Sequence, residues 1–271
     1  MHHSVLIDQP RCIGCGACAD DCPASNITLQ ESPSGTAARQ RTAHVLEPDN
    51  CLFCGHCEAI CPVGAVSLTG FDEQPAEVDG PVRLDPDVLM QAIRTRRSIR
   101  HFKDQPVPEE IIEKILEAGR LTQTAKNSQR QSYAVLRDRL AEAERIAVAG
   151  LRAVLAEEVA KAGADSVSPL GRTEVTDDFM FFGAPLAIVV LSPSKTDGCL
   201  AAENMALMAE ACGLGVLFSG FFTDIANLAL PLREMLGIDE TRQAVATLVL
   251  GWPDIRYRRT VRREPVRVTW L

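Results

Sequence analysis

A cysteine motif that occurs twice constrains this sequence more than any other feature. Eight of the ten cysteines lie between Cys12 and Cys61, in two runs that share the spacing C-x2-C-x2-C-x3-C-P. A cubane iron–sulfur cluster needs four thiolates that converge on one small volume. In this spacing three of them come from one run and the fourth from the other. The repeat therefore predicts two [4Fe–4S] clusters within residues 1–70.

Each predicted cluster takes its ligands from both runs. A pair of structural zinc sites is the alternative, but zinc ligands usually occur as pairs separated by a longer loop. A disulfide framework would require export, and the three apolar residues that follow Ser4 do not predict a signal peptide. The first ligand set consists of Cys12, Cys15, Cys18 and Cys61, and the second of Cys51, Cys54, Cys57 and Cys22.

The net charge is concentrated on the cysteine-rich part. Residues 1–80 contain 11 acidic and 3 basic residues, whereas residues 81–271 contain 25 of each. Such an acidic surface repels nucleic acid and favours docking of a basic electron-donor protein; a solvated acidic face without a partner is the alternative. The longest apolar run, Ala184–Leu191, is too short to span a bilayer. We therefore expect a soluble, cytoplasmic protein that binds neither nucleic acid nor membranes.

The sequence divides into three segments. Residues 1–70 hold the cysteines, and the 28 residues between the two runs predict an extended hairpin loop centred on residues 32–40. Residues 71–84 are rich in proline, glycine and acidic residues, which is typical of a linker. Residues 85–271 mix helices and strands without a repeating βαβ series or a GxGxxG loop.

The sequence of the second domain predicts the order of its helices and strands. Helices are expected over 86–96, from 108 along an apolar stripe that includes Ile112 and Ile115, over 140–162 and over 198–212. Strands are expected at 133–136, 185–191, 216–219 and 245–250, with one helix between the last two.

An arginine-rich stretch at residues 94–102 is the most informative part of this domain. Four arginines and a serine lie at the end of a predicted helix, and Ile99 and Phe102 anchor the turn. Arginine offers forked donors that match the geometry of a phosphate group. A cluster of this kind is, by itself, more often a solvated basic face.

Five short motifs, in order, resemble those of the nitroreductase family of FMN-dependent enzymes. They are RRSIRHF at 96–102, TAKNSQ at 124–129, Glu203–Met205 within a long helix, GLG at 213–215 and VLGWP at 249–253. The first segment resembles the bacterial two-cluster ferredoxins. The two resemblances imply an α+β protein, with a two-[4Fe–4S] ferredoxin-like domain at 1–70 and a nitroreductase-like domain at 85–271.

The resemblance also implies which residues bind FMN. No acid–base pair or nucleophile stands out as catalytic, and none is needed, because FMN itself carries hydride and single electrons. The implied set is Arg96, Arg97, Ser98 and Arg100 on the phosphate and ribityl chain, Asn127 on the isoalloxazine edge, Ser219 and Gly220 near the flavin's polar face, and Arg259 and Arg263 from the tail.

These features predict an iron–sulfur flavoprotein oxidoreductase that passes electrons between two [4Fe–4S] clusters and FMN. The resemblance implies a homodimer with FMN at its interface and a small acceptor such as a nitroaromatic, a quinone or another conjugated compound. Without a dinucleotide loop, we expect electrons to enter through the clusters and NAD(P)H to be a secondary donor. Two alternatives stay open: an electron carrier or redox sensor without turnover, and a flavin dehydrogenase that discharges electrons through its clusters. An open cavity over the flavin would favour an enzyme over a carrier.

Overall fold

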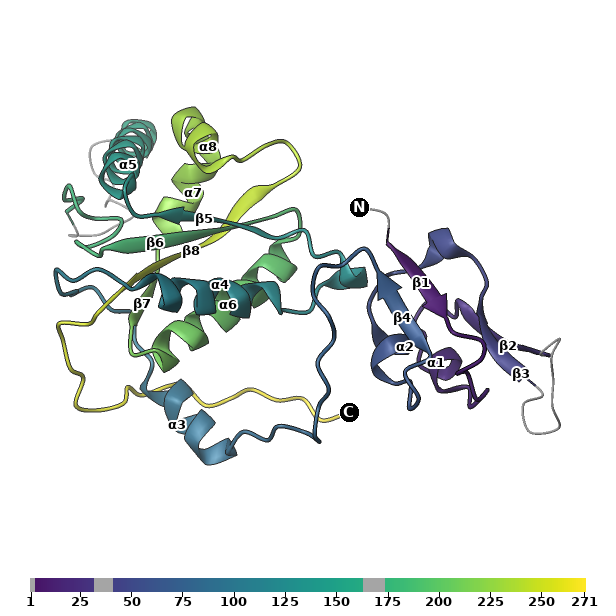
Figure 1. The fold of residues 1–271 in the computed structure, drawn as a ribbon. Coiled ribbons are helices and arrows are strands. Elements are labelled where there is room, and N and C mark those ends of the chain that lie inside the picture. The colour runs from purple at the N-terminus through teal and green to yellow at the C-terminus, as the bar shows by residue number, and fades with distance from the viewer. Residues whose placement is uncertain (1–2, 32–40, 163–173) are drawn as a thin grey trace. The chain divides into compact units, whose positions relative to one another are not determined.

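The computed structural model describes residues 3–31, 41–162 and 174–271. The chain divides into two compact units (Figure 1). The first consists of Met1–Arg83 together with Thr124–Ser128, and the second of Leu84–Gln123 and Gln129–Leu271. The boundary at Arg83 lies at the end of the predicted linker. The inclusion of Thr124–Ser128 in the first unit was not predicted.

The first unit contains two similar halves, one for each cysteine run. Each run passes through a glycine with left-handed backbone, Gly16 (φ 84°) or Gly55 (φ 77°), and then forms one helical turn. The turns are α1 (Ala17–Asp20) and α2 (His56–Ala59). Glycine is favoured at these two positions because an L side chain is strained at such φ values.

Two antiparallel strand pairs complete the first unit. β1 (Ser4–Ile7) pairs with β4 (Val66–Thr69), and β2 (Ile27–Glu31) pairs with β3 (Arg41–Val45). The paired β2 and β3 are the two arms of the predicted hairpin, whereas its centre at 32–40 lies outside the described residues. Two 3-10 turns, η1 (Pro48–Asn50) and η2 (Ala125–Asn127), also belong to this unit.

A four-stranded antiparallel sheet organises the second unit. Its strand order is β5 (Ser132–Leu136), β6 (Leu186–Ser192), β8 (Gln243–Gly251) and β7 (Gly215–Phe218). All seven residues of β6 are buried. Both faces of this strand are therefore covered. This explains why its apolar residues form a continuous run and do not alternate with polar ones.

Helices cover the two faces of the sheet (Figure 1). Val189 of β6 packs in the core formed with α5 (Leu140–Ala162), α7 (Gly220–Leu228) and α8 (Leu230–Leu236). Its neighbour Ile188 faces the opposite side, with α4 (Glu109–Arg120) and α6 (Lys195–Ala211). Successive residues of a strand point to opposite faces, so β6 joins the two cores.

The observed elements confirm the predicted α+β fold. The sheet is antiparallel throughout, and α3 (Pro86–Thr95) begins at Asp85, whose side chain accepts the backbone N–H groups of Asp87 and Val88. The single helix expected between β7 and β8 is two helices. Pro231 lies in the first turn of α8, where proline is tolerated, whereas inside a continuous helix it would break the hydrogen-bond ladder.

Among the residues that the structure describes, none of the helices has the length and apolar character needed to cross a lipid bilayer.

Candidate cofactor sites

Two cavities of the first unit are each lined by four cysteines. One is enclosed by Cys12, Cys15, Cys18 and Cys61, together with apolar residues such as Leu29, Ala43 and Val66. The other is enclosed by Cys22, Cys51, Cys54 and Cys57, with Ile27, Val45 and Leu68. The structure thus brings together the two ligand sets that the crossed pattern predicts.

Backbone N–H groups point at several of the sulfurs. Ala65 donates to Cys61 Sγ at 3.1 Å, and Asn26 donates to Cys22 Sγ at 3.3 Å. Each donor is four residues beyond its cysteine, so the two halves repeat the same contact. Hydrogen bonds of this kind stabilise a ligand thiolate and tune the potential of a bound cluster.

The protonation of the thiols also depends on their surroundings. Burial raises the pKa of Cys57 to about 11, and burial, followed by the nearby Cys12, raises the pKa of Cys18. At Cys61 burial acts in the same direction, but the backbone N–H groups of residues 63–66 outweigh it and lower the pKa. A thiol buried in this way loses its proton when its sulfur binds a cationic metal centre.

The arrangement of the cysteines fits a cluster better than zinc. In the described parts of the chain, no three His, Cys, Asp or Glu side chains converge closely enough to hold a single metal ion. A zinc site would need four sulfurs at about 2.3 Å from one centre. The eight cysteines surround two cavities instead, which is the arrangement that a larger iron–sulfur core requires.

In the second unit, the arginine-rich stretch is fixed to the edge of the sheet. The backbone N–H of Ile99 donates to the carbonyl of Val216 in β7 at 3.0 Å, and Lys103 donates to the carbonyl of Trp252 at 2.8 Å. Gly215 permits this close approach, because a Cβ there would lie 2.8 Å from Ile99 Cγ1. Arg100 lies between these two contacts, and Arg97 and Ser98 directly precede the first, so the contacts hold the backbone of this stretch at the sheet edge.

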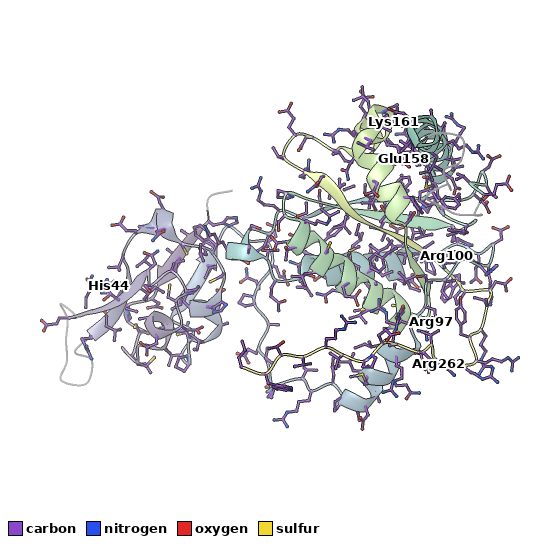
Figure 2. The ribbon with its side chains drawn as sticks, turned by 180° about the vertical axis from the view of Figure 1, so that it is seen from behind. His44, Arg97, Arg100, Glu158, Lys161 and Arg262 are labelled. Carbon is purple, nitrogen blue, oxygen red and sulfur yellow. The ribbon has the colours of Figure 1, made fainter. Side chains whose placement is uncertain are left out.

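A cavity of about 420 Å³ lies at this edge. It is bounded by the end of α3, by β7 and by the C-terminal tail, and Figure 2 shows Arg97 beyond the end of α3. Three of the predicted FMN residues before β7 and one from the tail meet there. The lining consists of Ile93, Arg96, Arg97, Ser98, Glu210, Val216, Phe218, Val261 and Arg263.

Arg96 has two carboxylate partners in α6. Its Nε lies 2.9 Å from Glu210 Oε2, and its terminal nitrogens contact Glu203. The hydrogen bond with Glu203 raises the pKa of Arg96, whereas burial raises the pKa of Glu210 and Arg96 offsets that effect only in part. Much of the charge of Arg96 is therefore compensated within the protein.

Arg97 is the arginine that lacks such compensation. Its Nη1 donates to the carbonyls of Arg94 and Arg96, but its Nε and Nη2 are buried and have no hydrogen-bond partner among the described residues. Leaving a buried cationic donor unsatisfied is costly. Arg97, Ser98 and Arg263 line the neighbouring cavity, and a set of cationic and hydroxyl donors of this kind fits a phosphate group.

A second cavity of about 320 Å³ adjoins the first. Phe218 lines both, and Ser219 and Gly220, at the start of α7, line the second. Glu203 and Cys199 of α6 form its opposite wall. The two cavities thus place the predicted phosphate residues and the predicted flavin-face residues next to each other.

Other predicted residues lie elsewhere. Arg100 does not line either cavity, and its guanidinium lies 5.8 Å from the ring centre of Phe182. Arg259 is exposed on the tail. Asn127 belongs to the first unit, where its Nδ2 donates to the carbonyl of Phe53 at 2.9 Å and to that of Leu52 at 3.3 Å.

Two family models match separate parts of this chain. Residues 11–65 match the 4Fe–4S dicluster domain, and residues 93–252, more than half of the chain, match the nitroreductase family. This chain belongs to the nitroreductase family. Its nitroreductase domain therefore follows an N-terminal iron–sulfur domain of the dicluster type, as the sequence predicted.

Several nitroreductase relatives are similar to this chain. A protein of Methanothermobacter thermautotrophicus, provisionally named NADH dehydrogenase/NAD(P)H nitroreductase, is 28% identical over 65% of this chain and 82% of its own length. The chloronitrobenzene nitroreductase of Comamonas testosteroni is 29% identical over 60% of this chain and 85% of its own. The FMN-bound nitroreductase structure from Bacteroides fragilis superposes with a TM-score of 0.53 at 18% identity, over 67% of this chain and 98% of its own. That likeness shows a shared fold.

Proposed function

We propose that this protein is an iron–sulfur flavoprotein oxidoreductase that passes electrons between two [4Fe–4S] clusters and FMN and reduces a small electron acceptor. The observation that carries the proposal is the combination, in one chain, of two four-cysteine cavities with a cavity lined by Arg97, Ser98 and Arg263. The family match supports the flavin, and the dicluster match supports the clusters.

The cysteines would hold the clusters in the crossed pattern. Cys12, Cys15, Cys18 and Cys61 line one cavity, and Cys22, Cys51, Cys54 and Cys57 line the other. The apolar walls keep water away from the sulfurs, and the N–H groups that donate to sulfur compensate the charge of the ligands.

The residues beside α3 would hold the FMN phosphate. Arg97 supplies two buried donors, and Ser98 and Arg263 line the same cavity. We assign Ser219 and Gly220 to the polar face of the flavin. Arg100, Asn127 and Arg259 stay predicted FMN ligands. FMN, when bound, supplies both hydride and single-electron chemistry. The task of the protein is then to orient the flavin and to exclude water.

The family match favours an enzyme over a carrier, because curated relatives of this chain are named as nitroreductases. We infer a conjugated acceptor, such as a nitroaromatic or a quinone, because one relative of 29% identity is a chloronitrobenzene nitroreductase.

We also propose a cytoplasmic homodimer. Three apolar side chains of α3 are unusually exposed: Val88 (66%), Met90 (53%) and Ile93 (47%). Trp270 in the C-terminal tail is 90% exposed. A second copy would cover such apolar surface. A basic electron-donor protein is the further partner that the acidic first unit favours.

Anaerobic purification with iron, sulfide and flavin quantification tests the proposal. We expect about eight iron atoms per chain, as two four-iron clusters require, with one FMN and turnover of a nitroaromatic or quinone. Tightly bound zinc without iron or acid-labile sulfide would overturn the cluster assignment. Bound FMN with no turnover of any acceptor would favour the electron carrier.

A further inference from the structure

An open groove beside α2 lies directly outside one of the cysteine-lined cavities of the first unit. The groove has a volume of about 550 Å³. Cys54, Gly55 and His56 line both this groove and the inner cavity that also contains Cys22, Cys51 and Cys57. The groove thus gives a molecule from solution access to a sulfur that we assign as a cluster ligand.

The side chains of the groove are acidic. Asp21 and Glu58 contribute carboxylates, no lysine or arginine among the described residues lines the groove, and His56 Nδ1 lies 3.2 Å from Asp21 Oδ2. Glu58 also accepts the backbone N–H of Leu68 at 3.0 Å, which holds its carboxylate in place. These two carboxylates belong to the 11 acidic residues that residues 1–80 contain against 3 basic ones.

The groove also has an apolar part. Ile60, directly after α2, is 42% exposed, and Ala59 and Pro75 lie beside it. An apolar contact next to acidic side chains is typical of surfaces that bind a protein, because burial of the apolar part supplies affinity and the charges supply steering.

The other cysteine set offers a less suitable surface. Cys15 is exposed, and Ile13 next to it is 46% exposed. However, the Arg11 guanidinium lies there, with its Nη2 donating to the carbonyl of Val63 at 2.7 Å, and Val63 lines that cysteine cavity. A fixed positive charge at this position repels a cationic partner, so electrostatics favour the groove at α2.

We propose that the groove formed by Asp21, Cys54, Glu58 and Ile60 is the docking site of a one-electron carrier protein with a basic, partly apolar surface. The inference rests on the proposed function, since it needs a redox-active cluster at Cys54. In each encounter one electron leaves the reduced partner and enters the cluster, or leaves the reduced cluster and enters the oxidised partner. No bond is made and no proton is transferred.

Outer-sphere oxidation of the pre-reduced holoenzyme tests the site with probes of known charge. Cytochrome c serves as the basic protein probe, hexaammineruthenium(III) as the small cation and ferricyanide as the small anion. The double variant Asp21→Asn/Glu58→Gln should react about tenfold more slowly with cytochrome c at low ionic strength, and its rate should depend less on salt, because steering of this kind accelerates association by about 10-fold or more. The rate with ferricyanide should rise.

A matched variant separates the groove from the overall charge. Glu31→Gln/Asp79→Asn removes the same charge from exposed positions outside the groove lining and should change each rate less than twofold or so. Ile60→Lys keeps both carboxylates and should slow cytochrome c and accelerate ferricyanide. Equal effects of the two double variants, or an unchanged cytochrome c rate in Ile60→Lys, would overturn the docking site.

Iron and sulfide analysis distinguishes failure of the docking-site proposal from failure of the proposed function. Protein that retains its iron and reduces its acceptor, but shows no effect of the groove variants, would disprove the docking site alone. Protein without iron would disprove the clusters, and the groove proposal with them.

Discussion

Asn127 Nδ2 donates a hydrogen bond of 2.9 Å to the carbonyl oxygen of Phe53, the residue directly before Cys54. Both residues have left-handed backbone, with φ values of 51° for Asn127 and 48° for Phe53. Asparagine tolerates this region, whereas a bulky side chain such as phenylalanine rarely adopts it. The Asn127 amide therefore supports a strained turn between two cysteines of the same cavity.

Replacing Asn127 tests this support. Asn127→Ala should lower the stability of the first unit by about 1 kcal/mol, the usual contribution of such a hydrogen bond. Bleaching of the cluster absorbance on heating should begin at a lower temperature, and the signal of one cluster should change while FMN stays bound. Asn204→Ala is the matched control, because Asn204 Nδ2 donates to Thr122 Oγ1 at 2.7 Å in the second unit. Unchanged bleaching in Asn127→Ala would refute the supporting role.

Arg97 and Arg96 should respond differently to removal. Arg97→Ala should leave the thermal stability of the flavin-free protein unchanged or raise it, because two buried unsatisfied donors disappear. Its Kd for FMN should rise by about 10- to 100-fold, since a hydrogen bond to a charged group contributes about 1.5–3 kcal/mol. Flavin fluorescence titration measures the Kd for FMN of both Arg97→Ala and Arg96→Ala.

Arg96→Ala provides the contrast. It leaves the partly buried carboxylate of Glu210 and the exposed carboxylate of Glu203 without their cation, so the melting temperature of the flavin-free protein should fall. The double variant Arg96→Ala/Arg100→Ala should release most of the flavin if these two arginines also bind FMN, as the family resemblance implies, and full occupancy there would rule out that role. Full FMN occupancy in Arg97→Ala would contradict the phosphate site.

Glu144 predicts a pH dependence of stability. Its carboxylate accepts the backbone N–H of Phe181 at 2.9 Å, and burial raises its pKa above the ordinary value of 4.5. The folded state therefore binds the proton more tightly than the unfolded state, and this contribution to stability is lost as pH rises through the folded pKa. Glu144→Gln keeps an acceptor oxygen and should be more stable than the wild type at pH 8, with the difference vanishing near pH 4.5.

At Glu142, on the same helix, the stability should depend on pH in the opposite direction. The hydrogen bond from Arg139 lowers the pKa of this exposed carboxyl, so its contribution is present at neutral pH and is lost as pH falls. Glu142→Gln should therefore lower the melting temperature slightly at pH 7. Melting curves from pH 4.5 to 8 compare both variants, and parallel curves for Glu144→Gln and the wild type would be inconsistent with a buried charge.

Local patterns were sufficient for much of the fold. The repeated cysteine spacing specified which four side chains meet, because each run wraps one cavity and supplies one residue to the other. Asp85 and Pro86 marked the start of α3, and the unbroken apolar run of β6 marked a strand buried on both faces. Each of these signals depends on residues that are close in sequence.

The remaining features depend on distant residues. Arg96 finds Glu203 and Glu210 only after α6 has packed against the sheet, and the motif that contains Arg96 carries no sign of these partners. Arg100 lies over Phe182, whose left-handed backbone no motif marks. Asn127 contacts carbonyls more than 70 residues away, so its place beside the cysteines could not be read from the sequence.

Anaerobic rapid mixing tests most directly whether electrons reach FMN through the clusters. Wild type, Cys15→Ala, Cys54→Ala and the control Cys212→Ala are mixed in turn with reduced methyl viologen, a low-potential one-electron donor, and with NADH, a hydride donor. We predict that Cys15→Ala and Cys54→Ala lose most of the rate of FMN reduction by methyl viologen, while their reduction by NADH matches that of the wild type and of Cys212→Ala. Rapid reduction by NADH in every variant, with undiminished reduction by methyl viologen and undiminished substrate turnover in both cluster variants, would contradict the account.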